Sequence, residues 1–477
     1  MSTDTEQPLY LRIADRLEGM IRSGTLRAGD RIPSVRQYGQ QQGVSVPTVM
    51  QAYTLLESRR LIEARPKSGF YVTARLARSL AEPVLPRHKP TTATLDNFAS
   101  VLSTIRDIND PTLVPLGRAV PGDELIPLEK LTKVTASVVR RSPGTCFHYD
   151  PAPGSQALRR ELSRRSIDWG CAFEPDEFIV TIGASEALQL ALMAVTRPGD
   201  TVLVESPSYY GTLSLLAKLK LRVIPVPACS CGLDLAAVRQ AVARNKVAAM
   251  LVIPNFSNPA GGFMSEANRR QLLDIADEHA IPIVEDDIYG DLPHQGSRPP
   301  CLKAMDRTDR VLLCGSYSKT LAPGLRVGYL VGGKHHQRLM ELKNAMNLGG
   351  PALSALTVAE FLRSGGYDRH LRKLREAYRN QTCRIREKVA EVFPEETRVS
   401  NPAGGLVLWL ELPEHVDVVE VHREARAAGI NFAPGTLFSP VGLFRNCMRL
   451  SCGQPWTPRI ESAIATLGAI VKRQAEA

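Results

Sequence analysis

Hydrophobic and polar positions follow one period at the start of the chain and another in the rest of it. In residues 1–75, apolar residues recur at intervals of three and four, which predicts short amphipathic helices. From about residue 111 onward, apolar runs such as FIVTIG, AAMLVIPN and RVLLCGS alternate with helical patterns. Short buried strands that alternate with helices predict a mainly parallel sheet with helices on its faces. The pattern therefore predicts a small, mainly helical unit followed by a large α/β unit.

The small unit is predicted to hold three helices and a hairpin. A first helix extends from about Pro8 to Ser23. Ser34 can cap a second helix, which Gly43 ends, and Ser45 can cap a third. The third helix carries an apolar stripe, formed by Val46, Val49, Tyr53 and Leu56. After it, LIEARPKSGFYV contains two short β-prone runs around a turn, which predicts the hairpin.

Helices joined by a glycine turn and followed by a hairpin are typical of a winged helix-turn-helix. In such a unit the third helix enters the major groove of DNA, and the wing contacts phosphates or the minor groove. The residues expected to face DNA are Arg36, Ser45, Thr48, Gln51, Thr54 and Lys67. The alternative is a small three-helix cap with solvated arginines, but the spacing of caps, turn and hairpin favours DNA binding.

Charge and a family resemblance support the same interpretation. Residues 1–75 hold eleven Lys and Arg against seven Asp and Glu, a net of +4 out of the +10 of the whole chain. Neutralisation of phosphates supplies most non-specific affinity for DNA. The segment RIPSVRQYGQQQGVSVPTVMQAYTLLESRRLIEARPKSGFYV resembles the winged helix of GntR-type regulators, which implies binding to double-stranded operator DNA. Pro47 departs from that family's pattern, because a basic residue is common at its position.

The rest of the chain divides into a linker and one large domain. Prolines interrupt residues 76–110 and predict an extended spacer, so the expected domains are 1–75, the linker 76–110, and 111–477. From about Met346 the large domain becomes rich in helix and then ends in a mixed segment with GGLVLWLEL and CMRLSC. This change predicts a smaller C-terminal subdomain.

A lysine in the segment CGSYSKTLAPGLRVGYL is the first candidate for chemistry. A single lysine is usually a solvated surface charge, but Lys319 has unusual neighbours. An amine that acts as a nucleophile needs a lowered pKa, which burial or a nearby cation such as Arg326 provides. The hydroxyls of Ser316 and Ser318 together with Arg326 could hold a phosphate group.

Further polar residues follow other predicted strands. In TIGASEALQL a strand ends and a helix begins, so the free amides near Ala184 and Ser185 favour an anion, although this pattern is common in α/β folds. Asp286 and Tyr289 in IVEDDIYGDL could bind one planar ligand. A metal site or a solvated acidic turn is the alternative there, and metal is the weaker one because no His lies at ligand spacing.

Two more candidates complete the set of strand ends. Asn258 lies in the turn NFSNPAGG, where its amide can donate to an oxygen. Tyr209 follows a strand in ESPSYYG, where its ring can stack on a flat ligand. Each feature is weak alone, but all are predicted at the edge where α/β sheets bind their ligands.

In order and spacing, these residues resemble the fold-type I aminotransferases that use pyridoxal 5′-phosphate (PLP). The resemblance implies that Lys319 forms the internal aldimine, Asp286 keeps the pyridine nitrogen protonated, and Tyr209 stacks on the ring. It implies that Tyr289 and Asn258 donate to the 3-oxygen of the ring. The implied phosphate cup is Ala184, Ser185, Ser316, Ser318 and Arg326.

Two further positions are carried over from the same resemblance. Tyr149 in HYDPAPGSQALRREL matches a tyrosine that reaches the phosphate bound by the partner subunit, which implies a homodimer. Arg449 in FRNCMRLSCG matches the arginine that holds the α-carboxylate of a substrate. A guanidinium fork suits a carboxylate better than an ammonium group does.

A GntR-type winged helix, a linker and an aminotransferase-like domain in one chain resemble the MocR-type transcriptional regulators. The resemblance implies a head-to-tail dimer whose large domain senses PLP, or an amino compound that forms an aldimine with it. A working aminotransferase with an accessory DNA-binding unit is the main alternative, because no matched catalytic position is replaced. A gauge of free PLP alone is a third hypothesis.

Composition limits the remaining possibilities. Hydrophobic residues make up 44% and charged residues 23% of the chain, as in ordinary globular proteins. No apolar run reaches the ~18 residues that span a bilayer, and the polar start MSTDTEQPLY predicts no export signal, so a cytoplasmic protein without membrane contact is expected. The nine cysteines lack CxxC pairs, which predicts reduced thiols rather than a disulfide framework or zinc site.

Overall fold

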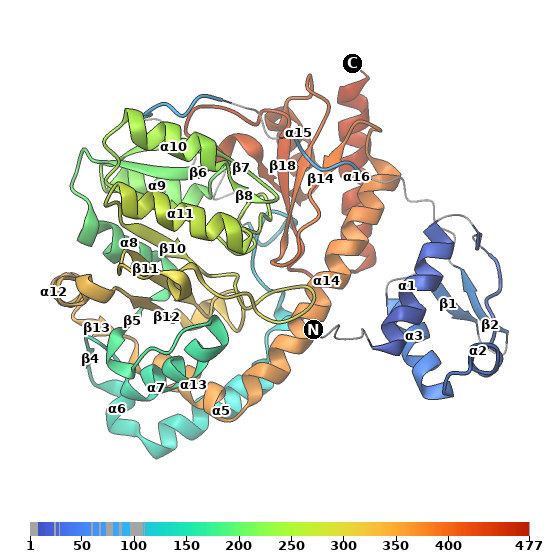
Figure 1. Ribbon diagram of the computed structural model, residues 1–477, viewed down its shortest axis with the longest axis horizontal. Helices are drawn as coiled ribbons and strands as arrows, with labels where there is room; N and C mark the ends of the chain where they lie inside the picture. The colour runs from blue at the N-terminus through green and yellow to red at the C-terminus, as the bar shows by residue number, and fades with distance from the viewer. Residues whose placement is uncertain are drawn as a thin grey trace, which may run out of the picture. The chain divides into compact units, whose positions relative to one another are not determined.

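The structure is a computed structural model of the full chain, and it forms two compact units, Met1–Ser79 and Leu80–Ala477 (Figure 1). The residues it describes are 8–22, 25–27, 29–58, 61–65, 68–72, 80–84, 88–95, 108 and 110–476. Each unit has its own hydrophobic core.

The first unit has the three helices and the hairpin that the sequence predicts. Its elements are α1 (Leu9–Arg22), α2 (Val35–Gln42), α3 (Val46–Ser58), β1 (Ile62–Arg65) and the antiparallel β2 (Gly69–Val72). The hydroxyl of Ser34 accepts a hydrogen bond from the amide of Gln37 at 3.2 Å, and Gly43 ends α2 with a φ of +64°. Both predicted signals of α2 are therefore confirmed. The predicted end of the first helix at Ser23 lies outside the described residues.

One residue of the predicted apolar stripe is not buried. Val49, Tyr53 and Leu56 are fully buried against α1 and α2, but Val46 is 45% exposed. Val46 is the first residue of α3, and the buried part of the helix begins one turn later, at Val49. The apolar stripe of α3 therefore begins one turn before the part of the helix that packs in the core.

The second unit is built on an eight-stranded sheet, in the order β5-β12-β11-β10-β9-β6-β7-β8. The sheet is mainly parallel, as predicted, and only β12 and β8 run against its other described strands. The strands are β5 (Phe178–Thr181), β6 (Thr201–Ser206), β7 (Arg222–Cys229), β8 (Gly232–Leu233), β9 (Ala249–Val252), β10 (Ile283–Asp286), β11 (Val311–Ser316) and β12 (Gly328–Val331).

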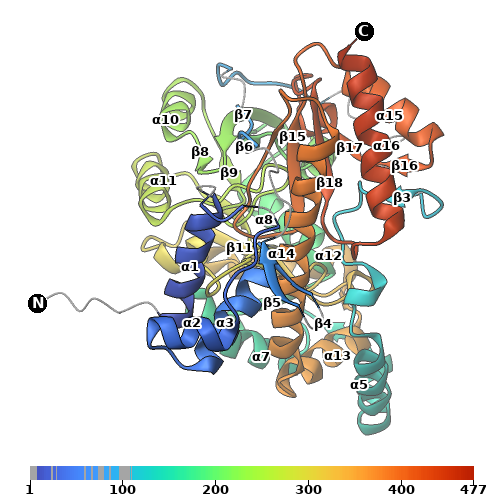
Figure 2. The same ribbon diagram turned by 90° about the vertical axis from the view of Figure 1, so that its right-hand side faces the viewer.

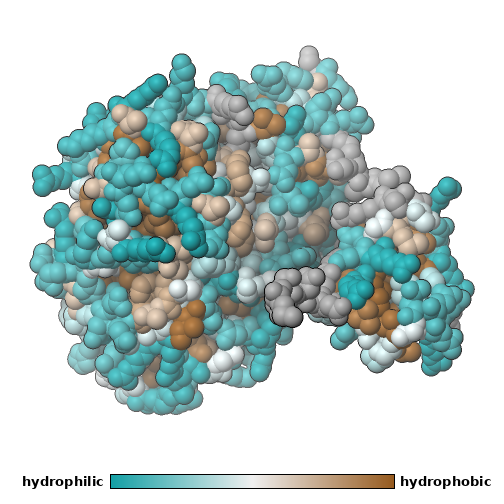
Figure 3. Space-filling view, in the orientation of Figure 1, coloured by the Kyte–Doolittle hydropathy of each residue, from teal (hydrophilic) through white to brown (hydrophobic). Residues whose placement is uncertain are grey.

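Helices cover both faces of this sheet. Alternate strand residues enter two different cores: Val202 and Val204 pack on the side of α8, and Leu203 packs on the side of α10 and α11. Outward residues of α10 and α11 are mostly hydrophilic in the view of Figure 3. The helices around the sheet are α7 (Gln156–Ser166), α8 (Gly183–Val195), α9 (Tyr210–Lys218), α10 (Leu235–Arg244), α11 (Glu266–Glu278) and α12 (His336–Asn347). Three further helices, α5 (Leu128–Arg141), α6 (Pro143–Phe147) and α13 (Ala352–Arg363), pack together beside α7.

A smaller subdomain forms the C-terminal part of this unit, as predicted. Its antiparallel sheet has the order β14-β15-β18-β17, and the long helix α14 packs against α16 beside it (Figure 2). These elements are α14 (Gly366–Val392), β14 (Arg398–Val399), β15 (Val407–Glu411), α15 (Val418–Ala427), β17 (Ala433–Pro434), β18 (Cys447–Ser451) and α16 (Pro458–Ala475). Short ladders join β3 (Val114–Pro115) to β16 (Ile430–Asn431) and β4 (Asp150–Pro151) to β13 (Gly349–Gly350).

The described part of the predicted linker lies along this unit. The amide of Val399 donates to the carbonyl of Ala81, and the amide of Val84 donates to the carboxylate of Glu411 at 2.7 Å. Further on, Ala93 pairs with Val223 of β7. The segment is thus extended, as the prolines predict, and hydrogen-bonded to both the small sheet and the large one.

The expectation for the cysteines needs one correction. Cys229 and Cys231 form a disulfide in the turn between β7 and β8, where their Cα atoms lie 5.2 Å apart. The turn brings the two sulfurs together, which a count of CxxC spacings does not detect. Within the described residues, no helix is both long and apolar enough to cross a membrane.

Candidate PLP site and DNA-binding surface

A cavity of about 410 Å³ lies at the carboxyl ends of the large sheet's strands. Asp286 ends β10, Tyr209 follows β6, and Lys319 follows β11. Chain segments far apart in sequence therefore meet at one sheet edge, as predicted from the strand ends. The predicted residues that line the cavity are Ala184, Ser185, Tyr209, Asn258, Asp286, Tyr289, Ser318, Lys319, Arg326 and Arg449.

Lys319 lies in the wall of this cavity. Its amine donates a hydrogen bond to the carbonyl of Ala119 at 2.6 Å. Burial, together with the guanidinium groups of Arg449 and Arg326, lowers the pKa of Lys319 from 10.5 to about 8, and the nearby Asp286 opposes this change. A larger fraction of this amine is thus neutral and nucleophilic at neutral pH than of a surface lysine.

The three consecutive acids at the end of β10 have separate surroundings. Side chains alternate along a strand, so Asp286 faces the cavity while Glu285 and Asp287 face away from it. Asp286 is 6% exposed, and within the described part of the chain its carboxylate accepts a hydrogen bond from the amide of Ile288 at 3.3 Å. Burial raises the pKa of Asp286 to about 7. A buried carboxylate with so few donors suits a cationic partner in the cavity.

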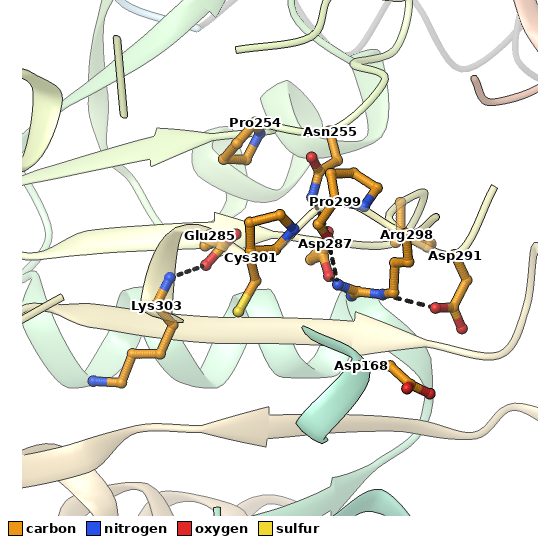
Figure 4. Close-up of polar contacts among 12 residues, drawn as sticks. Asp168, Pro254, Asn255, Glu285, Asp287, Asp291, Arg298, Pro299, Cys301 and Lys303 are labelled. Atoms are coloured by element: carbon orange, nitrogen blue, oxygen red, sulfur yellow. Dashed lines mark hydrogen bonds and ion pairs between the residues drawn. The ribbon is translucent and has the colours of Figure 1, made fainter. Parts of the chain in front are cut away.

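The other two acids are held by a buried polar network (Figure 4). Asp287 pairs with Arg298 and accepts a hydrogen bond from the amide group of Asn255 at 2.7 Å. The guanidinium of Arg298 also donates to Asp291 at 2.7 Å. Glu285 accepts from two backbone amides, those of Leu302 at 2.6 Å and Lys303 at 2.9 Å. This network fixes the end of β10 and therefore the position of Asp286.

A second part of the cavity wall suits an anion. The first turn of α8 begins at Gly183, which has a φ of +75°, and its following residues Ala184 and Ser185 line the cavity. A Cβ atom at Gly183 would lie 2.6 Å from the guanidinium of Arg326, so only glycine permits this approach. Arg326 also donates to the hydroxyl of Ser318 at 3.3 Å. Helix amides, a guanidinium and a hydroxyl together match the acceptors of a phosphate group.

Arg449 forms the wall on the side of the small subdomain. It lies on β18, is fully buried, and donates to the amide oxygen of Asn258 at 3.1 Å and to the carbonyl of Gly117. Its Nε atom is buried without a hydrogen-bond partner in the described part of the chain. Asn258 in turn donates to the hydroxyl of Tyr289 at 3.3 Å. An unsatisfied buried N–H favours a further acceptor in the cavity.

Two predicted cofactor residues do not line the cavity. The hydroxyl of Ser316 lies behind it, 2.9 Å from that of Ser318, and donates to the carbonyl of Val327 at 3.0 Å. Ser316 therefore positions Ser318. Tyr149 precedes β4 and is 84% exposed, so its ring does not enter the cavity of its own chain.

The structure also adds residues that the sequence reasoning missed. Arg118, Gln189 and Tyr210 line the cavity, and the buried carboxyl of Glu205 accepts a hydrogen bond from the amide of Ile253 beside it. Tyr210 adjoins the predicted Tyr209, so the doubled tyrosine in ESPSYYG was a usable signal. The other candidates were found because they follow strands of the large sheet. Arg118 precedes the first of these strands, so the same rule could not identify it.

The predicted DNA-facing residues that the structure describes lie on the surface of the first unit. Arg36, Gln51 and Thr54 are exposed. The hydroxyls of Ser45 and Thr48 are 2.7 Å apart at the start of α3. Lys67 lies outside the described residues. Tyr71 of the hairpin packs under the guanidinium of Arg65 at 4.5 Å.

Comparisons with known proteins identify both units. Residues 9–72 match the model of bacterial regulatory proteins of the gntR family, and residues 117–465 match aminotransferase class I and II. The chain is 37% identical over 473 residues to YjiR of Escherichia coli K12, an uncharacterized HTH-type transcriptional regulator, covering 98% of this chain and 99% of that protein. The chain belongs to the MocR-type subfamily of GntR transcriptional regulators.

The large unit of this MocR-type regulator is also similar to free-standing enzymes. It is 30% identical over 378 residues to 2-aminoadipate transaminase of Thermus thermophilus, which covers 78% of this chain and 94% of that protein. The crystal structure of α-aminoadipate aminotransferase LysN from the same organism, complexed with N-(5′-phosphopyridoxyl)-L-leucine, has a TM-score of 0.75, 29% identity, and coverage of 80% of this chain and 97% of that one. The large unit of the MocR-type regulator thus has the PLP-dependent fold-type I aminotransferase fold.

Proposed function

We propose that this MocR-type regulator binds PLP in the cavity around Lys319 and uses it to sense an amino compound, which alters its binding to operator DNA. The observation that supports this most is the combination of a reactive amine, a buried carboxylate, an anion cradle and a buried arginine in one cavity. These groups match the chemistry of PLP, which supplies an aldehyde that reacts with amines and a ring that withdraws electrons.

Each part of the cavity has a proposed role toward PLP. Asp286 would face the ring nitrogen, and its charge would favour the protonated ring. Tyr209 would pack on the ring, with Asn258 and Tyr289 near its 3-oxygen. The phosphate would lie at the anion cradle, formed by Ala184, Ser185, Ser318 and Arg326 with Ser316 in support.

Arg449 is the proposed site for the carboxylate of the effector. Contacts within the small subdomain connect Arg449 to the predicted linker. Arg449 lies on β18 opposite Trp409 of β15, and β15 ends at Glu411, which accepts the hydrogen bond from the amide of Val84. A ligand that binds better to one arrangement of the small subdomain would therefore also favour one arrangement of residues 80–84.

A head-to-tail homodimer is part of the proposal. Phe147 and Tyr149 are 73% and 84% exposed, and β4 next to them pairs with β13, which follows the 60% exposed Leu348. Such a group of exposed apolar residues is typical of a surface that another subunit covers. In this dimer Tyr149 would reach the phosphate in the cavity of the partner.

An absorbance titration tests the proposal. The full-length protein loaded with PLP is titrated with a panel of amino acids, and its affinity for DNA is measured in parallel. A spectral change that persists with one amino acid, together with a change in DNA affinity, would support sensing. If no amino acid changed either quantity, the proposal would fail.

Enzymatic turnover is a second candidate, because Lys319, Asp286 and Arg449 all line the cavity. The same titration distinguishes it. A transaminase converts an amino acid and a 2-oxo acid into products, and its spectrum returns to the starting state when the oxo acid is added. Product analysis after incubation with both substrates gives the direct measurement.

The lowered pKa of Lys319 predicts a pH dependence for cofactor uptake. The neutral amine fraction rises about tenfold per pH unit below the pKa and then levels off. We expect the rate of PLP uptake by cofactor-free protein to rise with pH and level off near pH 8, since the pKa of Lys319 is about 8. Uptake can be stopped with borohydride and measured by mass spectrometry. A rate still rising steeply above pH 9 would contradict the assigned environment.

The exposed residues of the first unit predict two different effects on DNA binding. Gln51→Ala should reduce affinity for an operator selected from random DNA by about tenfold, because a bidentate base contact contributes about 1–3 kcal/mol. Arg36→Gln should weaken binding to all sequences and lower the salt slope by about 1. Fluorescence anisotropy over a range of salt concentrations measures both. Equal loss on random DNA for Gln51→Ala would contradict base recognition.

A further inference from the structure

Arg118 occupies a distinctive place in the cavity wall. It is half-buried between Gly117, whose carbonyl accepts from Arg449, and Ala119, whose carbonyl accepts from Lys319. Arg118 therefore lies on the segment that joins the proposed carboxylate site to the reactive amine. It lines the same cavity as both.

Basic residues outnumber acidic ones in the cavity wall, and Arg118 has no acidic partner among the described lining residues. Among the described residues that line it, Arg118, Lys319, Arg326 and Arg449 are basic and Asp286 is the one acid. In the proposed function, Arg326 would hold the phosphate, Asp286 would face the ring nitrogen, and Arg449 would bind the carboxylate of the effector. Lys319 would be the amine next to the aldehyde. Only Arg118 then lacks an anion.

Protein groups do not supply that anion in the described part of the chain. No carboxylate there lies within 4.0 Å of Arg118, whereas Arg298 and Arg165 near the sheet each pair with an acid. An arginine is always charged, and one in a partly enclosed cavity is best stabilised by a bidentate acceptor. A ligand carboxylate has that geometry.

We propose that Arg118 binds a second carboxylate of the effector, so that this regulator responds to amino acids with an acidic side chain. The inference rests on the proposed function and narrows its ligand class. The amino group would face Lys319, the α-carboxylate Arg449, and the side-chain carboxylate Arg118. Gln189 and Tyr210 line the same cavity and offer further polar groups.

The test compares acids with isosteric neutral amino acids. Full-length protein loaded with PLP is titrated with L-aspartate, L-glutamate and L-2-aminoadipate, and with L-asparagine and L-glutamine, using visible absorbance to obtain Kd. We expect the best acid to bind about tenfold to a hundredfold more tightly than its amide, as charge-assisted hydrogen bonds allow. Arg118→Gln should remove this preference, and Arg118→Lys should keep part of it.

Controls separate this inference from the proposed function. Arg160→Gln changes an exposed arginine on α7 outside the cavity and should leave the preference unchanged. The inference about Arg118 would be wrong if neutral amino acids bound as tightly as acidic ones. It would also be wrong if Arg118→Gln kept the preference for acids. Neither result would contradict the proposed sensing of amino acids. If no amino acid changed the spectrum of the wild-type protein, both the proposed function and the inference about Arg118 would be wrong.

Discussion

Replacement of Lys319 by alanine should abolish covalent attachment of PLP and its visible absorbance band. The structure places no other lysine among the described residues that line the cavity, so no second amine is available there. Non-covalent binding should persist in a weakened form, because the anion cradle of Ala184, Ser185, Ser318 and Arg326 does not include the lysine. The measurement is the mass of the protein after reduction with borohydride, followed by peptide mapping.

The matched control for this experiment is Lys133→Ala, an exposed lysine on α5 that pairs with Glu129. It should retain both the absorbance band and the added mass. The Lys319→Ala variant should also lose its response to amino acids in DNA-binding assays. A normal response, or attachment of the cofactor at another lysine, would contradict the role assigned to Lys319.

Replacement of Arg298 by alanine should destabilise the large unit by about 3–5 kcal/mol, the usual cost of removing one partner from a buried ion pair. The side chain of Asp287 is 0% exposed and that of Arg298 is 5% exposed, so the remaining carboxylate would be buried without its main counter-charge. Burial already raises the pKa of Asp287, and Arg298 opposes that effect. The loss should therefore become smaller as the pH is lowered, because a protonated carboxyl carries no charge.

Tryptophan fluorescence during urea unfolding reports on this unit alone, since Trp169, Trp409 and Trp456 all lie in it. The control is Arg239→Ala, which breaks an ion pair with Glu278 whose side chains are 51% and 53% exposed. Its effect should stay within about 1 kcal/mol. Similar losses for both variants would mean that the network in Figure 4 does not hold the end of β10 through its charges.

Local patterns in the sequence determined the elements and much of the site. Helix caps such as Ser34 and Gly43 depend on neighbours in the chain, so they could be predicted without the fold. The same holds for a polar residue directly after a buried strand, which is why Asp286, Asn258 and Lys319 could be expected at one sheet edge. The family resemblance then assigned roles to these positions that no spacing could supply.

Only the tertiary structure decided which distant groups meet. The carbonyl of Ala119 lies beside the amine of Lys319, 200 positions away, and that of Gly117 lies beside Arg449. These contacts place Arg118 in the cavity, although nothing near it in the sequence suggests a ligand. The tertiary structure also decided that Val46 is exposed, because the apolar spacing along α3 does not show where the hydrophobic core ends. Local residue types therefore specify strands, caps and candidate chemistry, whereas charge balance and burial depend on contacts between segments far apart in the chain.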